Sequence, residues 1–310
     1  HQTFKGRINE NFSSMHRSGF VNIIGRPNAG KSTLMNALVG ERMSIITAKP
    51  QTTRHRIIGL LSGDDFQIVF SDTPGIISDP AYKMQEAMNR FVETTFDDAD
   101  IMLFVAGIDE VFKDDDPIMQ QLRNIKAPIF LVLNKIDLSN QKEVVAKIQE
   151  WQKRIPFKEI FPLSARRQQG TAGLLKVITE SLPEGPAYYP KDQLTDRPER
   201  FFVSEIVREK ILEIYHQEIP YSVEVVVDAF KETQTNHGED LIRIAATIFV
   251  MRPTQKSIII GKGGVSIKQL GTAARMSLET FLETKIFLEL HVKVKENWRD
   301  DEQSLKRFGY

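Results

Sequence analysis

The chain has 310 residues and equal numbers of basic and acidic side chains, 41 of each, which argues against a wholly basic nucleic-acid-binding coat but leaves room for a local basic patch. Its composition, 41% hydrophobic and 26% charged, excludes collagen-like and broadly disordered proteins, and its length predicts two domains of roughly 150 residues each. The absence of cysteine excludes disulfide bonds and thiolate sites and suits a reducing cytosol, and the longest strongly apolar run, residues 101–108, is shorter than the roughly 20 residues that cross a bilayer.

The N-terminal segment, residues 1–14, is polar and lacks a pattern, and Met15 comes five residues before the first apolar run. We therefore expect the natural start at Met15, with residues 1–14 as an added leader. The alternative is a natural flexible arm.

From residue 20 onward, short apolar runs alternate with longer amphipathic stretches. Strands buried on both faces and separated by helices are typical of a mostly parallel α/β sheet. The expected strands cover residues 20–24, 57–61, 66–70, 101–105, 129–133 and 160–163. The expected helices cover residues 32–39, 82–96, 117–124, 141–154 and 172–181.

The pattern changes at residues 182–200, where four prolines predict a semi-rigid linker. Beyond it we expect a small α+β domain with a three-stranded sheet. Its expected elements are helix 203–216, strands 222–230 and 241–251, helix 265–283 and strand 286–294. The predicted organisation is a first domain over 15–185, a linker over 186–200 and a second domain over 201–310.

A phosphate-binding loop is the strongest single signal in the chain. Residues 25–32 lie between an expected strand and an expected helix and match the P-loop spacing G-x-x-x-x-G-K-[ST]. Glycines let the backbone wrap around phosphates, Lys31 is placed to reach the β- and γ-phosphates, and the Ser32 hydroxyl is placed to ligate Mg²⁺. The predicted phosphate-binding residues are Gly25, Arg26, Pro27, Asn28, Ala29, Gly30, Lys31, Ser32 and Thr33.

A second motif, Asp-Thr-Pro-Gly at residues 72–75, follows the expected strand 66–70. Asp72 is placed there to hold Mg²⁺, usually through water, and the Gly75 backbone N–H is placed to meet the γ-phosphate. Alone this tetrapeptide is a common turn. After a P-loop it predicts a phosphate sensor.

A third motif, Asn-Lys-Ile-Asp at residues 134–137, ends the expected strand 129–133. The Asp137 carboxylate can accept two hydrogens, from the guanine N1–H and from the exocyclic amine, and adenine offers no such pair. Asn134 would bind N7 and connect this loop to the P-loop. The three motifs in this order predict GTP rather than ATP as the ligand.

Together these motifs resemble the series found in translation-factor-class GTPases, and residues 163–165 are similar to the fifth motif of that class, in which the Ala165 N–H would contact guanine O6. Residues 50–56, Pro-Gln-Thr-Thr-Arg-His-Arg, resemble the switch I segment of the Era family of bacterial GTPases. That resemblance implies Thr53, with Thr52 as the alternative, as a Mg²⁺ ligand beside Ser32 and Asp72. The remaining implied GTP contacts are Thr73, Pro74, Gly75, Ile76, Lys135, Ile136, Ser164 and Ala165.

One residue departs from Ras-like enzymes. Ile76 occupies the position where those enzymes carry a water-orienting glutamine, and its side chain makes no hydrogen bond. We therefore expect slow intrinsic hydrolysis, with no residue assigned as catalytic beyond metal and transition-state support by Lys31 and Thr53. Asn28 resembles an asparagine that coordinates K⁺ in some relatives, which makes K⁺ a candidate cofactor beside Mg²⁺.

The second domain carries a basic G-x-x-G, residues 261–264, between an apolar run at 257–260 that reads as strand-like and the expected helix from 265. This motif clamps single-stranded nucleic acid in KH domains, whereas the other G-x-x-G, at 170–173, holds no basic residue. A solvated helix face is the alternative reading. The predicted RNA-binding residues are Lys256, Gly261, Lys262, Gly263, Gly264, Lys268 and Arg275.

The order of elements resembles a type II KH domain, the C-terminal domain of the Era family, and the resemblance covers residues 17–310. It implies a cytoplasmic, monomeric GTPase that binds GTP, GDP and ribosomal RNA near the small-subunit RNA 3′ end and acts in small ribosomal subunit assembly. Peripheral contact with the inner face of the cell membrane is a further expectation.

Two other functions fit part of the sequence. A metabolic P-loop phosphotransferase leaves residues 134–137 unexplained. A peripheral membrane GTPase would place the basic stretch 251–275 on anionic lipid.

Overall fold

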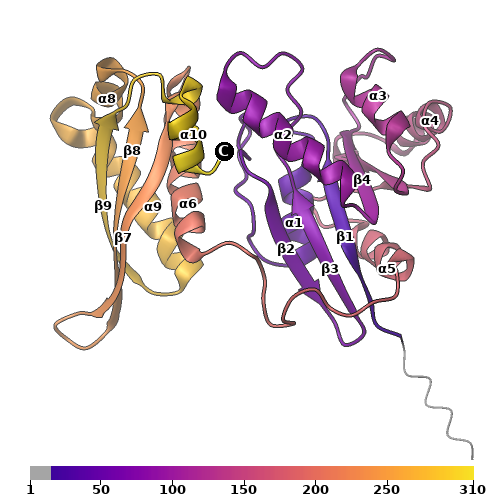
Figure 1. Ribbon diagram of the computed structural model, residues 1–310, viewed down its shortest axis with the longest axis horizontal. Coiled ribbons are helices and arrows are strands. Elements are labelled where there is room, and N and C mark those ends of the chain that lie inside the picture. The colour runs from indigo at the N-terminus through magenta and orange to yellow at the C-terminus, as the bar shows by residue number, and fades with distance from the viewer. Residues whose placement is uncertain (1–14) are drawn as a thin grey trace, which may run out of the picture.

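The computed structural model describes residues 15–310, so the expected leader lies outside the described residues. Two sheets, each with its own helices, lie side by side (Figure 1). The strands are β1 (Arg17–Ile24), β2 (Ile57–Ser62), β3 (Phe66–Asp72), β4 (Ile101–Gly107), β5 (Ile129–Asn134), β6 (Glu159–Pro162), β7 (Glu224–Gln234), β8 (Asp240–Val250) and β9 (Lys285–Val294). The α-helices are α1 (Lys31–Val39), α2 (Lys83–Asp97), α3 (Pro117–Asn124), α4 (Gln141–Gln152), α5 (Thr171–Ser181), α6 (Glu199–Ile214), α7 (Ile219–Ser222), α8 (Pro253–Ile260), α9 (Val265–Leu282) and α10 (Glu302–Phe308). Single 3₁₀ turns are η1 (Ile136–Leu138), η2 (Lys262–Gly264) and η3 (Trp298–Asp300).

The first sheet confirms the mostly parallel α/β prediction. Its strand order is β2-β3-β1-β4-β5-β6, and only the edge strand β2 runs antiparallel to its neighbour. One apolar core, with Leu34 of α1 and Leu174 of α5, covers one face, and a second, with Met119 of α3 and Trp151 of α4, covers the other. The strand order reverses at β1, and in open α/β sheets a ligand binds at the carboxyl ends of the strands beside that reversal.

The second sheet has the order β7-β8-β9, with β7 antiparallel and β9 parallel to β8. Helices α6, α8 and α9 contribute Val207, Ile259 and Leu270 to its core. This arrangement confirms the predicted small α+β domain with a three-stranded sheet.

One sequence-based assignment in the second domain is wrong. The apolar run 257–260 is not strand-like but is the last turn of helix α8. The Gln255 side-chain oxygen accepts the backbone N–H groups of Met251 and Arg252 at 2.9 and 3.1 Å, which caps the helix start. Pro253 in the first turn favours the helix as well, so the cap outweighs the β-propensity of the three isoleucines.

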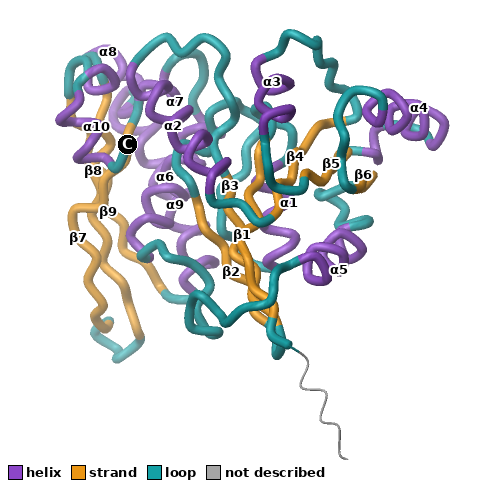
Figure 2. Tube along the Cα trace, turned by 45° about the vertical axis from the view of Figure 1, so that its right-hand side comes forward, coloured by secondary structure: helices purple, strands orange, loops and turns teal. Residues whose placement is uncertain are grey.

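The segment between α5 and α6, residues 182–198, lies along the edge strand β2; it holds most of the predicted linker 186–200, whose last two residues begin α6. The Leu60 N–H donates to the Leu194 carbonyl at 2.8 Å, and the Thr195 hydroxyl donates to the Ile58 carbonyl at 2.7 Å. Figure 2 shows this stretch as a loop that follows the sheet rather than leaving it. The connection between the domains is therefore bound to the first domain.

The C-terminal residues lie between the two domains, where Figure 1 marks the chain end. Trp298 and Leu305 pack there against Met84 and Met88 of α2 in an apolar cluster of their own. Trp298 is fully buried, and its indole N–H donates to the Ser222 carbonyl at 2.9 Å. The domains thus share a buried apolar contact in addition to the connecting chain.

Candidate functional site

A cavity of about 390 Å³ lies at the carboxyl ends of β1, β3 and β5. It brings together residues from all four predicted GTP-binding motifs and from the segment 45–53. The predicted residues that line it are Pro27, Asn28, Gly30, Lys31, Ser32, Thr33, Gly75, Asn134, Lys135, Asp137 and Ser164, together with Thr52 and Thr53. Pro27 and Ser164, which are 137 positions apart in sequence, therefore meet at one site because parallel strands end at one edge of the sheet.

The Lys31 ammonium lies inside the loop that precedes α1. It is buried and donates to the Arg26 carbonyl at 2.8 Å. Burial lowers the pKa of Lys31 to about 8, although the nearby charges of Asp72 and Glu110 oppose that shift. A phosphate at this position would supply the missing opposite charge, so the arrangement suits an anion-binding lysine.

Three oxygen-bearing side chains converge beside Lys31. The Ser32 hydroxyl lies 2.9 Å from the Thr53 hydroxyl and donates to Asp72 Oδ2 at 2.6 Å. The other Asp72 oxygen is buried without a hydrogen-bond partner, and burial raises the pKa of this carboxyl, with Ser32 and Lys31 opposing. An uncompensated buried carboxylate oxygen beside two hydroxyls fits a hard cation such as Mg²⁺.

Thr52, the alternative Mg²⁺ ligand, has other hydrogen-bond partners than Thr53. The Thr52 hydroxyl donates to the Lys49 carbonyl at 2.7 Å and contacts the Thr47 hydroxyl at 2.6 Å. This geometry favours Thr53 over Thr52 as the Mg²⁺ ligand. Within residues 15–310, no group of three or more His, Asp or Glu side chains is placed to hold a metal.

The base-recognition loop is fixed to the P-loop through Asn134. Its amide donates to the Ala29 carbonyl at 2.9 Å, and its oxygen accepts the Ala165 N–H at 3.0 Å. Gly30 makes this approach possible, because a Cβ there would lie 2.2 Å from the Asn134 amide nitrogen. The Ala165 N–H is thus engaged within the protein, and a contact with guanine O6 would have to be shared with Asn134.

Asp137 is held as an anion at the far end of the cavity. A hydrogen bond from Ser164 lowers the pKa of Asp137, and the Arg167 guanidinium, 3.6 Å away, acts in the same direction. An ionised carboxylate is the form that accepts two guanine hydrogens.

Nine of the predicted GTP contacts do not line the cavity: Gly25, Arg26, Ala29, Asp72, Thr73, Pro74, Ile76, Ile136 and Ala165. For Arg26 and Ile76 the side chains have other partners. The Arg26 guanidinium pairs with Asp116 at 2.6 Å and lies 3.9 Å from the centre of the Phe112 ring, so only its backbone faces Lys31. Ile76 packs against the apolar core on the α3 and α4 side of the sheet. Neither side chain lines the cavity.

Sequence reasoning missed the loop 45–49, which lines the cavity opposite the P-loop. Its residues, Ile45, Ile46, Thr47, Ala48 and Lys49, match no nucleotide-binding motif. It precedes Thr53 by a few residues, and that proximity was the only available signal.

The G-x-x-G of the second domain is a left-handed turn before α9. Gly261, Gly263 and Gly264 have φ angles of 74°, 63° and 78°. A Cβ at Gly261 would lie 2.5 Å from the Ser266 hydroxyl oxygen, whereas Gly263 and Gly264 face open space. Lys262 and Lys268 are exposed beside the turn, but Arg275 pairs with Glu279 at 3.0 Å on α9.

An apolar stripe on α9 accompanies these lysines and was also missed. Val265 and Met276 are 69% and 59% exposed, values unusual for large apolar side chains. They border a shallow cavity lined by Val265, Lys268, Gln269, Thr272, Ala273 and Met276. Their helical spacing was the available signal. Apolar surface edged with lysine is suited to unstacked bases beside phosphates.

Comparison with known proteins points in one direction. A family model described as a 50S ribosome-binding GTPase matches residues 20–135, and a KH domain model matches residues 218–299. The GTPase Era of Syntrophus aciditrophicus (strain SB) is 47% identical over 299 residues, which cover 96% of this chain and 96% of that protein.

Solved structures agree. An Era variant from Aquifex aeolicus bound to GDP and AlF₄⁻ is 36% identical, with a TM-score of 0.89, over 95% of this chain and 99% of that one. A structure of Era in complex with MgGDPNP and nucleotides 1506–1542 of 16S ribosomal RNA gives the same identity, TM-score and coverage.

Proposed function

Because this chain belongs to the Era family of GTPases, we propose that its second domain binds the 3′ region of small-subunit ribosomal RNA and that the protein acts in small ribosomal subunit assembly. The chain is a GTPase, which converts GTP and water to GDP and phosphate. The observation that carries the proposal is the pairing of one cavity, where four GTP motifs meet, with a separate basic G-x-x-G turn. The relative solved with 16S ribosomal RNA supports the choice of RNA.

Each group in the cavity has a role in this proposal. Lys31 neutralises the β- and γ-phosphates, Asp137 selects guanine, and Asn134 keeps the base loop against the P-loop. Ser32, Thr53 and Asp72 hold Mg²⁺, which supplies further neutralisation of phosphate charge. GTP orders the segments around Thr53 and Gly75, and loss of the γ-phosphate releases them.

Hydrolysis in this site proceeds without a water-orienting glutamine, since the position holds Ile76, which is partly buried and packs against the apolar core. We therefore propose K⁺ as a second cofactor at Asn28, which lines the cavity in a left-handed backbone conformation with φ 64°. Hydrolysis measured in K⁺ should exceed that in Na⁺, and Asn28→Ala should remove the difference. Equal rates in both salts would refute the K⁺ site.

The protein in this proposal is a cytoplasmic monomer. Among the helices of residues 15–310, none has the length and apolarity of a membrane span. Contact of the basic stretch with anionic lipid is a competing use of the same lysines. Sedimentation equilibrium checks the monomer, and co-sedimentation with anionic vesicles, with and without competing RNA, checks the lipid.

The deciding experiment is crosslinking in cells followed by sequencing of the bound RNA. We expect reads concentrated at the 3′ end of small-subunit RNA. Gly263→Asp should abolish the enrichment, because it places a carboxylate at the phosphate path. Gly263→Asn is the matched control, since it adds a side chain of the same shape in the same left-handed conformation without the charge, where no atom lies within 4 Å. Reads spread evenly over unrelated RNAs would contradict the proposal.

A further inference from the structure

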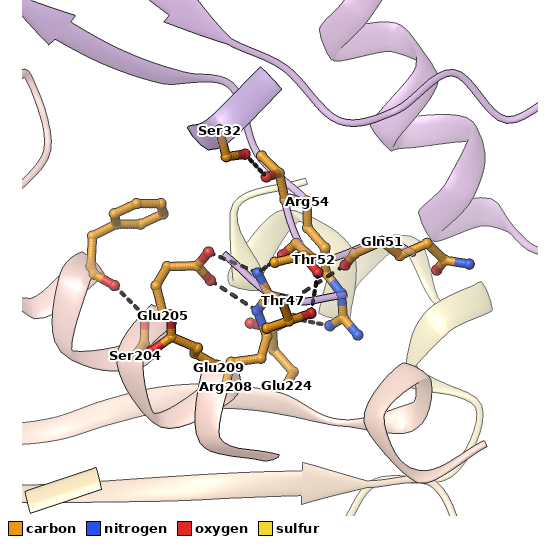
Figure 3. A network of polar contacts seen from close by, with 12 residues as sticks. Ser32, Thr47, Gln51, Thr52, Arg54, Ser204, Glu205, Arg208, Glu209 and Glu224 are labelled. Carbon is orange, nitrogen blue, oxygen red and sulfur yellow. Dashed lines mark hydrogen bonds and ion pairs between the residues drawn. The ribbon is translucent and has the colours of Figure 1, made fainter. Parts of the chain in front are cut away.

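The switch segment around Thr53 is held by the second domain. Figure 3 shows Arg54 and the backbone of Gln51 and Thr52 beside a group of side chains from α6 and β7. Thr53 itself, the residue whose hydroxyl meets Ser32, lies between these contacts and is buried. The metal-binding edge of the first domain is therefore built against the other domain.

Arg208 of α6 makes the contact on the N-terminal side of Thr53. Its guanidinium donates to the Thr52 carbonyl and, at 3.4 Å, to the Gln51 carbonyl. The Thr52 carbonyl and the Thr53 N–H belong to one planar peptide unit. A hydrogen bond that fixes the orientation of the carbonyl therefore also fixes the orientation of the Thr53 N–H. Arg208 thus acts on the backbone of the segment and not on the Thr53 hydroxyl.

Glu205 holds Arg208 in place. Its two oxygens accept Arg208 Nε and Nη2 at 2.9 and 2.7 Å, and the side chains are only 7% and 1% exposed. Burial opposes the ionisation of Glu205, but the charge and hydrogen bonds of Arg208 outweigh it and keep the pKa of Glu205 below its usual range. A bidentate pair of this kind has one well-defined geometry.

Arg54 makes the contact on the C-terminal side of Thr53. Its fully buried guanidinium donates to the Val223 and Pro220 carbonyls at 2.7 and 3.0 Å and pairs with Glu224 at 3.4 Å. Thr53 is therefore enclosed between two arginine contacts that cross the domain boundary in opposite directions.

We propose that Arg208 is a positioning residue that orients Thr53 toward the Mg²⁺ site, so that the second domain completes the GTPase site in the same chain. This inference rests on the proposed role of Thr53 as a metal ligand. Groups that orient a metal ligand from behind typically change metal affinity or activity 10–100-fold when they are removed.

The test measures binding rather than turnover. The quantity is the gain in affinity for a fluorescent, non-hydrolysable GTP analogue when Mg²⁺ is added, with full-length protein. Thr53→Ala reports the metal role itself. The double variant Glu205→Leu/Arg208→Met removes the carbonyl contacts and leaves no unpaired buried charge. Arg208→Lys keeps the charge but not the planar fork. Arg17→Met is the control, since Arg17 also donates to a backbone carbonyl, that of Leu182 at 2.7 Å, but has no contact with the switch segment.

We expect Thr53→Ala and the double variant each to lower the Mg²⁺-dependent gain about tenfold, Arg208→Lys to lower it less, and Arg17→Met to leave it unchanged. Affinity for GDP without Mg²⁺ should match the parent protein in every variant, which separates positioning from general loss of structure.

The outcomes test the positioning role of Arg208 and the metal role of Thr53 separately. If Thr53→Ala lowers the gain while the double variant and Arg208→Lys both keep the parent value, the inference about Arg208 is wrong and the metal role of Thr53 holds. If Thr53→Ala keeps the parent gain, the proposed metal role fails and the inference falls with it. Should the double variant fail to fold, a parent value in Arg208→Lys is sufficient to overturn the inference.

Discussion

The His55 imidazole lies against the Tyr310 ring, with 4.5 Å between the ring centroids. His55 belongs to the switch segment 50–56 of the first domain, and Tyr310 is the last residue of the sequence. Phe91 of α2 and Phe201 of α6 complete the aromatic surroundings at 5.7 and 5.9 Å. Burial lowers the pKa of His55 to about 4, with Arg197, Arg208 and Arg54 acting in the same direction and Glu205 against it. His55 is therefore neutral at physiological pH.

This environment predicts a loss of stability in mild acid. An unfolded histidine binds a proton as the pH falls through about 6.5, whereas folded His55 does so only near 4. Between these values the unfolded chain binds more protons, so the free energy of unfolding should fall with pH, by up to about 3 kcal/mol from this group.

Urea denaturation at several pH values between 7 and 4 measures this contribution. His55→Phe should show a flatter pH dependence than the parent protein, while substitution of the exposed His237 by Gln should not alter it. Parallel curves for the parent and His55→Phe would show that His55 does not titrate as described.

Lys31 predicts proton uptake on GTP binding at alkaline pH. Because the pKa of Lys31 is about 8, the side chain is charged below that pH and loses its proton above it. Phosphate binding requires the charged form at every pH. Affinity for GTP should therefore fall by up to about tenfold per pH unit above 8, until guanine itself begins to ionise.

Calorimetric titration at pH 8.5 in two buffers of different ionisation enthalpy counts the protons taken up. The parent protein should bind more than about half a proton per GTP, and Lys31→Met, with much weaker binding, should take up none. No uptake in the parent would contradict a depressed pKa for Lys31.

Asp137→Asn should exchange the base preference. The asparagine side chain has one acceptor oxygen and one NH₂ donor, whereas the aspartate carboxylate presents two acceptor oxygens to the guanine hydrogens. Affinity for GTP should therefore drop by about 10²-fold or more, while xanthosine triphosphate gains relative affinity. Competition binding with both nucleotides measures the ratio. An unchanged GTP affinity would remove Asp137 from the base-binding role.

Lys262→Ala should delete one phosphate contact in the second domain. Binding of single-stranded RNA should weaken across sequences, and the slope of log affinity against log salt should decrease by about 0.7. The control is an acid placed in the other G-x-x-G. Thr171 is buried there, so the exposed Ala172 is the better position, and Ala172→Asp should leave RNA binding alone. A parent-like salt slope in Lys262→Ala would show that this lysine does not reach the phosphates.

The parts of the site that could be predicted from sequence are those where the ligand chemistry requires particular residue types. The P-loop, residues 72–75 and residues 134–137 could be read from sequence because phosphate, metal and guanine each demand particular side chains at fixed spacing. The structure brings Ser32 within hydrogen-bond distance of Thr53 and Asp72, the three residues predicted as Mg²⁺ ligands, and Thr53 came from the switch I resemblance of residues 50–56. The loop 45–49 could not be read, since its residues match no nucleotide-binding motif.

The contacts between the two domains could not be predicted from the sequence either. Arg208 lies in no motif, and the switch I resemblance of residues 50–56 gives Arg54 no partner in the second domain. Surface arginines outnumber buried ones, so sequence alone gives no reason to bury these two. The run 257–260 misled for another reason: three isoleucines favour a strand locally, but the cap at Gln255 and the packing of Ile259 select a helix. Tertiary contacts decided each of these cases.

The chain between the domains also has a protective effect. Strand β2 lies at one edge of the six-stranded sheet. The unpaired N–H and carbonyl groups of an edge strand can form hydrogen bonds with a strand of another molecule. Leu194 and Thr195 occupy those groups on β2 in the intact chain. A fragment that ends at residue 185 would keep every GTP-binding motif but lose Leu194 and Thr195, so the Leu60 N–H and the Ile58 carbonyl would be free to pair with a strand of another molecule.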